Sequence, residues 1–260
     1  MKLLLVQPAL SYAPSADNLG IVTRIAERFA ADLGPDDIVL LPEHFDLRPW
    51  REEYEAGVSA LARRLGCHVV GGSHHEEREG GRVNSGVVAN PRGTIVSRYE
   101  KVRPYATERE RVQEGNAFGE LTIAGRSVLV LICADFWFSD LFARAAALPD
   151  VVLVPALSVT RKPTPHYSRA LWQHLAVARA YEFGTYVGIS DWAHVPTPEH
   201  LFFASGVAGF ADPTTLDPAA FFRPLNGDAR LYDLDFEALS VFRKDRRDRG
   251  FFWKRLPPDP

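Results

Sequence analysis

Near the middle of the chain, eight residues read Val128-Leu129-Val130-Leu131-Ile132-Cys133-Ala134-Asp135. Five consecutive apolar residues bounded by a polar turn are typical of a buried β-strand. The run ends abruptly in a thiol and a carboxyl group. The sequence therefore predicts a strand over residues 128–132 that presents reactive side chains at its carboxyl end.

The segments on either side of this run indicate mixed strand pairing. Upstream, Ala124-Gly125-Arg126 separates it from the apolar residues 121–123, which predicts a hairpin. Downstream, apolar and periodic segments predict alternating helices and strands. We expect a helix at about 139–147, a strand at 151–154, a helix at 166–183, and strands at 186–190, 207–210 and 231–234.

The N-terminal third predicts parallel strands joined by crossover helices. Strands are expected at 3–6, 37–41 and 68–71, with helices at 18–33 and 53–65 between them. A second hairpin is expected over 83–99, around Pro91-Arg92-Gly93. Together the hairpins and crossovers predict one α/β domain, residues 1–260, built of two mixed sheets packed together with helices outside. Residues from about 236 to 260 are interpreted as a C-terminal tail at a possible subunit interface.

Composition excludes several classes of protein. Hydrophobic residues make up 46% of the 260 residues and charged residues 24%, which is ordinary globular composition. The formal net charge of -3 leaves no basic surplus for phosphates, so we expect no nucleic-acid partner. The first apolar run is too short for a signal peptide, and no run reaches the roughly 18 residues of a membrane-spanning helix. Two cysteines fit a reducing compartment, so we expect a cytoplasmic protein without membrane partners.

Three reactive side chains follow apolar strands. Glu43 comes after residues 38–42, Lys101 after 96–100, and Cys133 after 128–132. Taken alone, these are a loop glutamate, a charged turn and a small buried cysteine. The carboxyl ends of strands are, however, where ligand crevices lie in open α/β sheets. The three groups can therefore meet in one site.

Together these groups have the chemistry of nucleophilic catalysis. A thiol becomes a nucleophile when a neighbouring base takes its proton, and a carboxylate in a dry crevice can be that base. An ammonium group can hold the oxyanion of a tetrahedral intermediate, beside the backbone N–H after the nucleophile. We therefore predict that Glu43, Lys101 and Cys133 form a catalytic triad that needs neither a metal nor an organic cofactor.

The motifs around these positions resemble those of the nitrilase, or carbon–nitrogen hydrolase, superfamily, in order and at similar spacing over roughly residues 1–235. They read Leu40-Leu41-Pro42-Glu43, Tyr99-Glu100-Lys101-Val102, Glu108 through Gly115-Asn116, and Leu131-Ile132-Cys133-Ala134-Asp135. The resemblance implies a four-layer α-β-β-α sandwich and pairing of chains into a homodimer or a higher homo-oligomer. It also implies a second glutamate, Glu108, that orients Lys101 or the substrate.

The resemblance implies a thiol-dependent hydrolase of a non-peptide carbon–nitrogen bond. Linear amides and carbamoyl compounds are favoured over nitriles, and the reaction passes through a thioester on the cysteine. Acyl transfer from the same thioester, or a non-catalytic ligand-binding protein of the same fold, are the alternatives. The N–H of Ala134 is expected in the oxyanion site. Trp137 and Phe138, which depart from the family pattern, are expected to line the substrate pocket, although core packing is an equal alternative.

Two further features need an interpretation. His74-His75-Glu76-Glu77 resembles a metal cluster, but adjacent side chains on a strand point to opposite faces, so we interpret it as an exposed hairpin tip. Cys67 is expected in the core. The Pro-containing segments 160–165 and 193–203 are expected to be loops that face the substrate.

Overall fold

The computed structural model describes residues 1–13, 15–160, 164–196 and 203–252. The first of its two main sheets has the strand order β16-β1-β2-β3-β5-β4, and β6 and β7 also pair with β5. The β1–β2, β2–β3 and β5–β7 pairs are parallel, whereas β16 pairs antiparallel with β1, and β5 pairs antiparallel with β3, β4 and β6. Its strands are β1 (Lys2–Val6), β2 (Ile38–Leu40), β3 (His68–Val70), β4 (His74–Arg78), β5 (Gly81–Ala89), β6 (Ile95–Glu100), β7 (Val112–Gln113) and β16 (Ala229–Asp233).

The second sheet has the order β15-β14-β12-β10-β9-β8 and is also mixed. The central pairs β9–β10 and β10–β12 are parallel, and the outer pairs are antiparallel. Its strands are β8 (Gly119–Ile123), β9 (Arg126–Val130), β10 (Val151–Pro155), β12 (Tyr186–Ser190), β14 (Gly209–Ala211) and β15 (Phe222–Pro224). A separate two-stranded ribbon pairs β11 (Val159–Thr160) with β13 (Phe203–Ala204).

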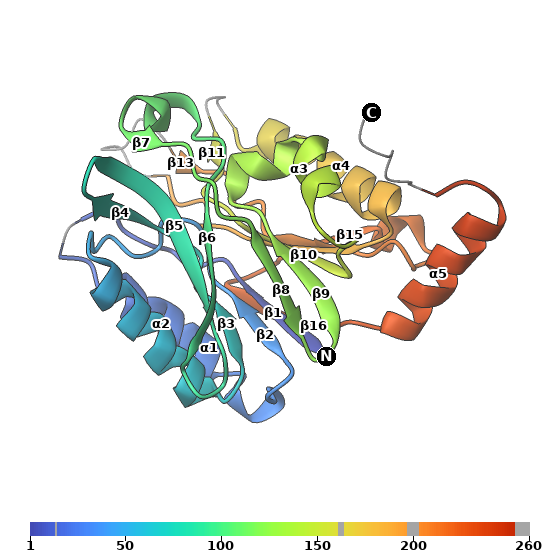
Figure 1. Cartoon of the computed structure of the whole chain (residues 1–260), viewed down its shortest axis with the longest axis horizontal. Helices are drawn as coiled ribbons and strands as arrows, with labels where there is room; N and C mark the ends of the chain where they lie inside the picture. The colour runs from blue at the N-terminus through green and yellow to red at the C-terminus, as the bar shows by residue number, and fades with distance from the viewer. Residues whose placement is uncertain (14, 161–163, 197–202, 253–260) are drawn as a thin grey trace.

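Helices cover the outer face of each sheet, which gives the predicted four layers (Figure 1). The first sheet carries α1 (Asn18–Glu27) and α2 (Arg51–Leu65), and the second carries α3 (Ser139–Arg144) and α4 (His166–Phe183). Asp17 caps α1 by accepting a hydrogen bond from the N–H of Gly20, and left-handed Gly66 ends α2. The predicted α/β sandwich of two mixed sheets is confirmed.

The alternation of side chains along β1 explains why this strand is continuously apolar. Leu3 and Leu5 belong to the core between the two sheets, while Leu4 and Val6 belong to the core under α1 and α2. Both faces of the strand are therefore buried, as in parallel sheets. At Gly188 of β12 the sheets come so close that a Cβ atom would lie 2.6 Å from Cδ2 of Leu3. Glycine at this position permits the close sheet packing.

Three sequence-based expectations differ from the structure. The helix expected over 18–33 ends at Glu27 and is followed by a short 3₁₀ helix, Ala30–Asp32, because Phe29 and Leu33 can pack on the core without a continuous α-helix. The exposed hairpin tip expected at 74–77 is wrong: these residues lie in β4, and the turn follows at 79–80. The expected tail begins with a helix, α5 (Phe236–Asp248), while residues 253–260 lie outside the described residues.

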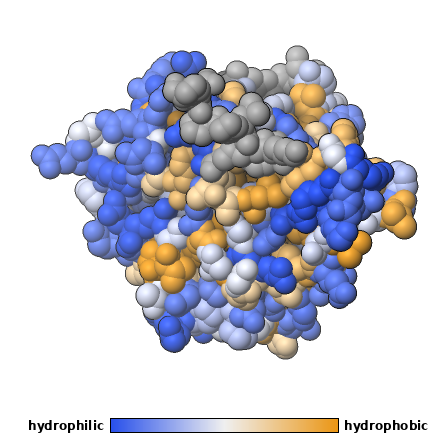
Figure 2. Space-filling view, turned by 45° about the vertical axis from the view of Figure 1, so that its right-hand side comes forward, coloured by the Kyte–Doolittle hydropathy of each residue, from blue (hydrophilic) through white to orange (hydrophobic). Residues whose placement is uncertain are grey.

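In Figure 2, hydrophobic residues form separate patches between hydrophilic ones on the face in view. Across the part of the chain that the structure describes, no helix combines the length and the hydropathy needed to cross a membrane. Cys67 is fully buried in the core under α2, as expected.

Candidate active site

The ends of three strands bring Glu43, Lys101 and Cys133 together. Lys101 follows β6 directly, Glu43 lies three residues beyond β2, and Cys133 begins a 3₁₀ helix, Cys133–Trp137, after β9. Nζ of Lys101 donates hydrogen bonds to Oε1 of Glu43 at 2.7 Å and to Oε2 of Glu108 at 2.6 Å. The predicted acid, amine and second glutamate thus form one cluster, and all three follow strands of the first sheet.

Glu43 is held by groups from four different segments. It is 4% exposed, and Oε1 also accepts a hydrogen bond from Nδ2 of Asn84 at 2.9 Å. Oε2 accepts from the backbone N–H of Leu157 at 3.0 Å, and Nε1 of Trp192 donates to the Glu43 carbonyl at 2.8 Å. Since each of these contacts comes from elsewhere in the sequence, the orientation of the carboxylate is set by tertiary structure.

Opposite charges stabilise Lys101 and Glu108 in their ionised forms. Burial lowers the pKa of Lys101, but the nearby negative charges of Glu43 and Glu108 raise it by more, so its pKa lies above the ordinary value. Burial raises the pKa of Glu108, but hydrogen bonds from His75, Lys101 and Asn84 lower it by more, so its pKa lies below the ordinary value. The cluster therefore presents an ammonium group held between the side chains of Glu43 and Glu108.

Cys133 has the backbone and the environment of a constrained nucleophile. Its φ of 47° is left-handed, which is uncommon for a residue other than glycine, and such strain is concentrated at functional sites. The side chain is buried, and Sγ lies 3.8 Å from the carbonyl oxygen of Leu157. Burial, and then the charge of Glu43, raise the pKa of the thiol well above its ordinary value, although Lys101 opposes this. The resting thiol is therefore protonated and needs a base.

Asp135 connects the nucleophile turn to the strand that carries the lysine. Its carboxylate accepts hydrogen bonds from the backbone N–H groups of Val102 at 2.9 Å and Arg103 at 2.8 Å. Burial raises the pKa of Asp135 to about 6. These contacts link the two residues after Lys101 to the turn that carries Cys133.

Sequence reasoning missed four contributors to this cluster. Asn84 Nδ2 bridges Glu43 and Glu108, at 2.9 and 2.7 Å, and Nε2 of His75 lies 3.1 Å from Oε1 of Glu108. The others are the backbone of Leu157 and the indole of Trp192, which is buried under Glu43. An asparagine inside the apolar strand 83–90 was a usable signal, because a buried amide requires partners. Nothing local to the other three indicates their role.

A half-buried histidine directly follows Glu43 in the sequence. The His44 ring packs on that of His75 with centroids 4.2 Å apart, and its φ of 52° is also left-handed. Burial lowers the pKa of His44 to about 3, so this ring is neutral over the working range of the site. The neutral His44 ring therefore packs on His75, which contacts Glu108, without adding a positive charge to the site.

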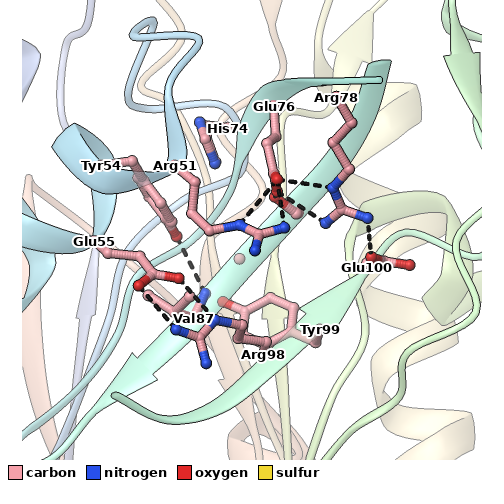
Figure 3. Close-up of a pocket in the computed structure, with 12 residues that line it drawn as sticks. Arg51, Tyr54, Glu55, His74, Glu76, Arg78, Val87, Arg98, Tyr99 and Glu100 are labelled. Atoms are coloured by element: carbon pink, nitrogen blue, oxygen red, sulfur yellow. Dashed lines mark hydrogen bonds and ion pairs between the residues drawn. The ribbon is translucent and has the colours of Figure 1, made fainter. Parts of the chain in front are cut away.

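The opposite face of β4, β5 and β6 carries an ionic network (Figure 3). Pairing places Asn84 of β5 opposite His75 and places Ser85 opposite both His74 and Glu100, so successive residues face opposite sides. Behind the catalytic cluster, Glu76 accepts hydrogen bonds from Arg51, Arg78 and Ser85. The same three strands thus direct His75 and Asn84 to the carboxylates of Glu43 and Glu108 on one face and carry this network on the other.

We expect Glu76→Gln to lower the free energy of unfolding by about 2 kcal/mol, because it removes a buried charge that two guanidinium groups face. Burial raises the pKa of Glu76, but its hydrogen bonds lower it to about 2. The stabilisation is therefore complete above about pH 4.5 and decreases as the pH falls towards 2. Urea unfolding at pH 7 and pH 3 measures both effects.

The matched control for this change is Glu77→Gln, on the same strand. Glu77 pairs with Arg82 at the surface, and exposed pairs contribute roughly 0.5 kcal/mol. Equal losses of stability in the two variants at pH 7 would contradict a structural role for the network.

Ala134, Trp137 and Phe138 all line a cavity of about 400 Å³ beside Cys133. Core packing is not their role, because Trp137 is 38% exposed and Phe138 is 43% exposed. Trp192 is not part of this lining, and its Nε1 donates instead to the backbone carbonyl of Glu43. Of the loops expected to face the substrate, residues 161–163 and 197–202 lie outside the described residues.

A two-sheet α-β-β-α sandwich with a thiol, a carboxylate and an ammonium group at its strand ends defines a nitrilase-type enzyme. The family model described as "Carbon-nitrogen hydrolase" matches residues 5–200. The chain therefore belongs to the carbon–nitrogen hydrolase family and is an enzyme of that class.

Individual relatives are similar to it at moderate distance. Omega-amidase NIT2-B of Xenopus laevis is 29% identical over 213 residues, which cover 73% of this chain and 74% of the relative. The crystal structure of XC1258 from Xanthomonas campestris, a CN-hydrolase superfamily protein with an arsenic adduct in its active site, has a TM-score of 0.78. It is 20% identical and covers 99% of this chain and 98% of its own. A mutant amidase from Nesterenkonia sp. AN1 has a TM-score of 0.72 at 21% identity, with 96% and 99% coverage.

Proposed function

We propose that this enzyme hydrolyses the carbon–nitrogen bond of a small linear amide or carbamoyl compound through a thioester on Cys133. The observation that carries this proposal is the buried cluster of Glu43, Lys101 and Cys133 at the end of a cavity. The acrylamide adduct on the active-site cysteine of the structurally similar Nesterenkonia amidase supports a reactive thiol in this fold.

In the first half-reaction, Sγ of Cys133 attacks the carbonyl carbon while Glu43 takes the thiol proton. The raised pKa of the thiol makes this transfer necessary. Lys101 and the N–H of Ala134 hold the oxyanion of the tetrahedral intermediate. The carbon–nitrogen bond then breaks, Glu43 returns the proton to the leaving nitrogen, and ammonia or an amine departs.

In the second half-reaction, water attacks the thioester carbon and gives a proton to Glu43. The carbon–sulfur bond breaks, the thiolate recovers that proton, and a carboxylic acid leaves. The sum is an amide plus water giving an acid plus ammonia or an amine. Glu108 remains ionised throughout and holds Lys101 in place from the side opposite Glu43.

Mass spectrometry of the intact enzyme tests this proposal without knowledge of the natural substrate. A panel of primary amides and carbamoyl compounds is mixed with the enzyme, quenched in acid, and assayed for ammonia and for covalent adducts. We expect ammonia release together with an acyl adduct on the peptide that contains Cys133, while Cys67 stays unmodified because it lies in the core.

The outcomes separate the proposal from its alternatives. An adduct that persists in water but transfers to hydroxylamine would instead indicate an acyltransferase. Neither ammonia nor adduct, together with a Cys133 that alkylates no faster than a free thiol, would favour a non-catalytic binding protein.

A further inference from the structure

The cavity beside Cys133 has a mainly apolar wall. Besides Tyr105, the large side chains that line it include Trp137, Phe138, Tyr167, Leu171 and Trp172. Trp137 ends the short helix that begins at Cys133, Phe138 follows it, and Tyr167, Leu171 and Trp172 lie on α4. An amide whose carbonyl carbon lies at Sγ would extend its acyl group along this wall.

Packing holds the aromatic part of the wall in one arrangement. The rings of Trp137 and Trp172 meet edge to face, with centroids 5.6 Å apart and planes at 87°. Behind them, the buried Phe136 ring stacks on Trp172 at 10°. Offset and edge-to-face arrangements of this kind are favourable, so the shape of the cavity is formed before a substrate binds.

Two hydroxyl groups of the cavity lining, those of Ser158 and Thr160, have partners within the protein. The hydroxyl of Ser158 donates a hydrogen bond to the buried carboxyl group of Asp191, and that of Thr160 donates to the carbonyl of Thr164 at 3.4 Å. Among the residues that the structure describes, none that lines the cavity is a lysine, arginine, histidine, aspartate or glutamate. This part of the wall therefore offers no counter-charge to an ionised acyl group.

Two arginines that contact the wall are paired with carboxylates. The guanidinium of Arg103 lies 4.1 Å from the centroid of the Phe138 ring, but it donates two hydrogen bonds to Asp140, at 2.9 and 2.6 Å. Arg179 donates to the backbone carbonyl of Trp137 and pairs with Glu182 at 2.9 Å. An acyl carboxylate would have to compete with these existing pairs.

We propose that the substrate carries an uncharged, apolar acyl group, an alkyl chain of up to about six carbons or an arylalkyl group, and that the cavity discriminates against acyl groups that end in a carboxylate. The inference rests on the proposed amide hydrolysis and names its substrate class. Removing a carboxylate from water without a partner is unfavourable, whereas each buried methylene contributes to binding.

A matched pair of amides tests this inference. Hexanamide and adipamic acid have the same six-carbon acyl chain, but only the second ends in a carboxylate. We expect kcat/KM for hexanamide to be at least 100-fold higher at pH 8. From acetamide to hexanamide we expect an increase of about fourfold per methylene, which corresponds to about 0.8 kcal/mol. Equal or greater kcat/KM for adipamic acid would overturn the inference.

A charged variant tests whether the acyl group occupies this cavity. Leu171→Arg places a cation in the wall, so we expect the ratio of kcat/KM for adipamic acid to that for hexanamide to rise at least tenfold. The matched control is Leu216→Arg, since Leu216 is 98% exposed and outside the cavity, and this variant should leave the ratio unchanged. An unchanged ratio in Leu171→Arg would show that the acyl group lies elsewhere.

Protection of Cys133 from iodoacetamide separates this inference from the proposed function. We expect hexanamide to slow alkylation at a concentration at which adipamic acid does not. If hexanamide protects but neither amide is hydrolysed, the proposed hydrolysis fails while the apolar preference stands. If both are hydrolysed and adipamic acid protects equally well, the preference fails while the hydrolysis stands.

Discussion

Replacing Cys133 with alanine is expected to reduce kcat for any amide substrate by at least about 10⁴-fold, because the attacking atom is removed. The remaining cluster can still orient a substrate, but Glu43 and Lys101 alone cannot form the thioester. Fold and binding should be retained, since alanine is smaller than cysteine and tolerates the same buried position. Ammonia release measures the first effect, and calorimetric titration with the same amide measures the second.

The matched control for the nucleophile is Cys67→Ala, which removes the other thiol of the chain. Cys67 lies fully buried under α2, and burial raises its pKa to about 12, so its thiol is inert. This variant should lose some stability through a small cavity but keep its kcat. Activity above about one hundredth of wild type in Cys133→Ala would rule out the thioester mechanism.

Glu43→Gln is expected to have the second largest effect, a loss of about 10³-fold in kcat. Glutamine keeps the shape of the side chain but cannot take the thiol proton. The same change should shift the alkylation of Cys133 to lower pH, because the charge of Glu43 raises the pKa of the thiol while Lys101 lowers it. The variant should therefore be less active although its thiol ionises more easily.

Two measurements check this combination: steady-state ammonia release, and the rate of iodoacetamide labelling of Cys133 between pH 6 and pH 10. The exposed Glu110→Gln is the matched control, and it should change neither quantity. If Glu43→Gln kept more than a tenth of wild-type kcat, or if its labelling midpoint moved to higher pH, Glu43 would not be the base beside the thiol.

The sequence alone predicted the order of the elements and pointed to Glu43, Lys101 and Cys133 as a cluster, whose contacts the structure shows. Buried strands have continuous apolar runs, and α4 and β12 begin and end at the predicted residues. The reactive side chains at the ends of such runs could be recognised in the sequence, because burying an ionised group is energetically unfavourable unless the group is paired. Motif order then indicated the family, which the match over residues 5–200 confirms.

Local reasoning was least accurate where a residue's environment comes from a distant segment. The 74–77 segment is rich in charge and was expected at a surface turn, yet Glu76 is buried because Arg51 and Arg78 approach it. The same strand directs His75 to the catalytic side, where it meets Glu108. The sequence predicts that successive side chains of a strand point to opposite faces, but it does not predict which residues pack against each face.

Only the tertiary structure decided how the side chain of Glu43 is oriented and which residues form the cavity wall beside Cys133. Asn84, Leu157 and Trp192 reach Glu43 across sequence separations of 41, 114 and 149 residues. Contacts at such separations leave no periodic pattern in the sequence, because each depends on the register of two sheets and on the turns that join them. The strand pattern is a local consequence of burial, whereas the orientation of the catalytic carboxylate and the apolar wall beside the thiol arise only when distant segments pack together.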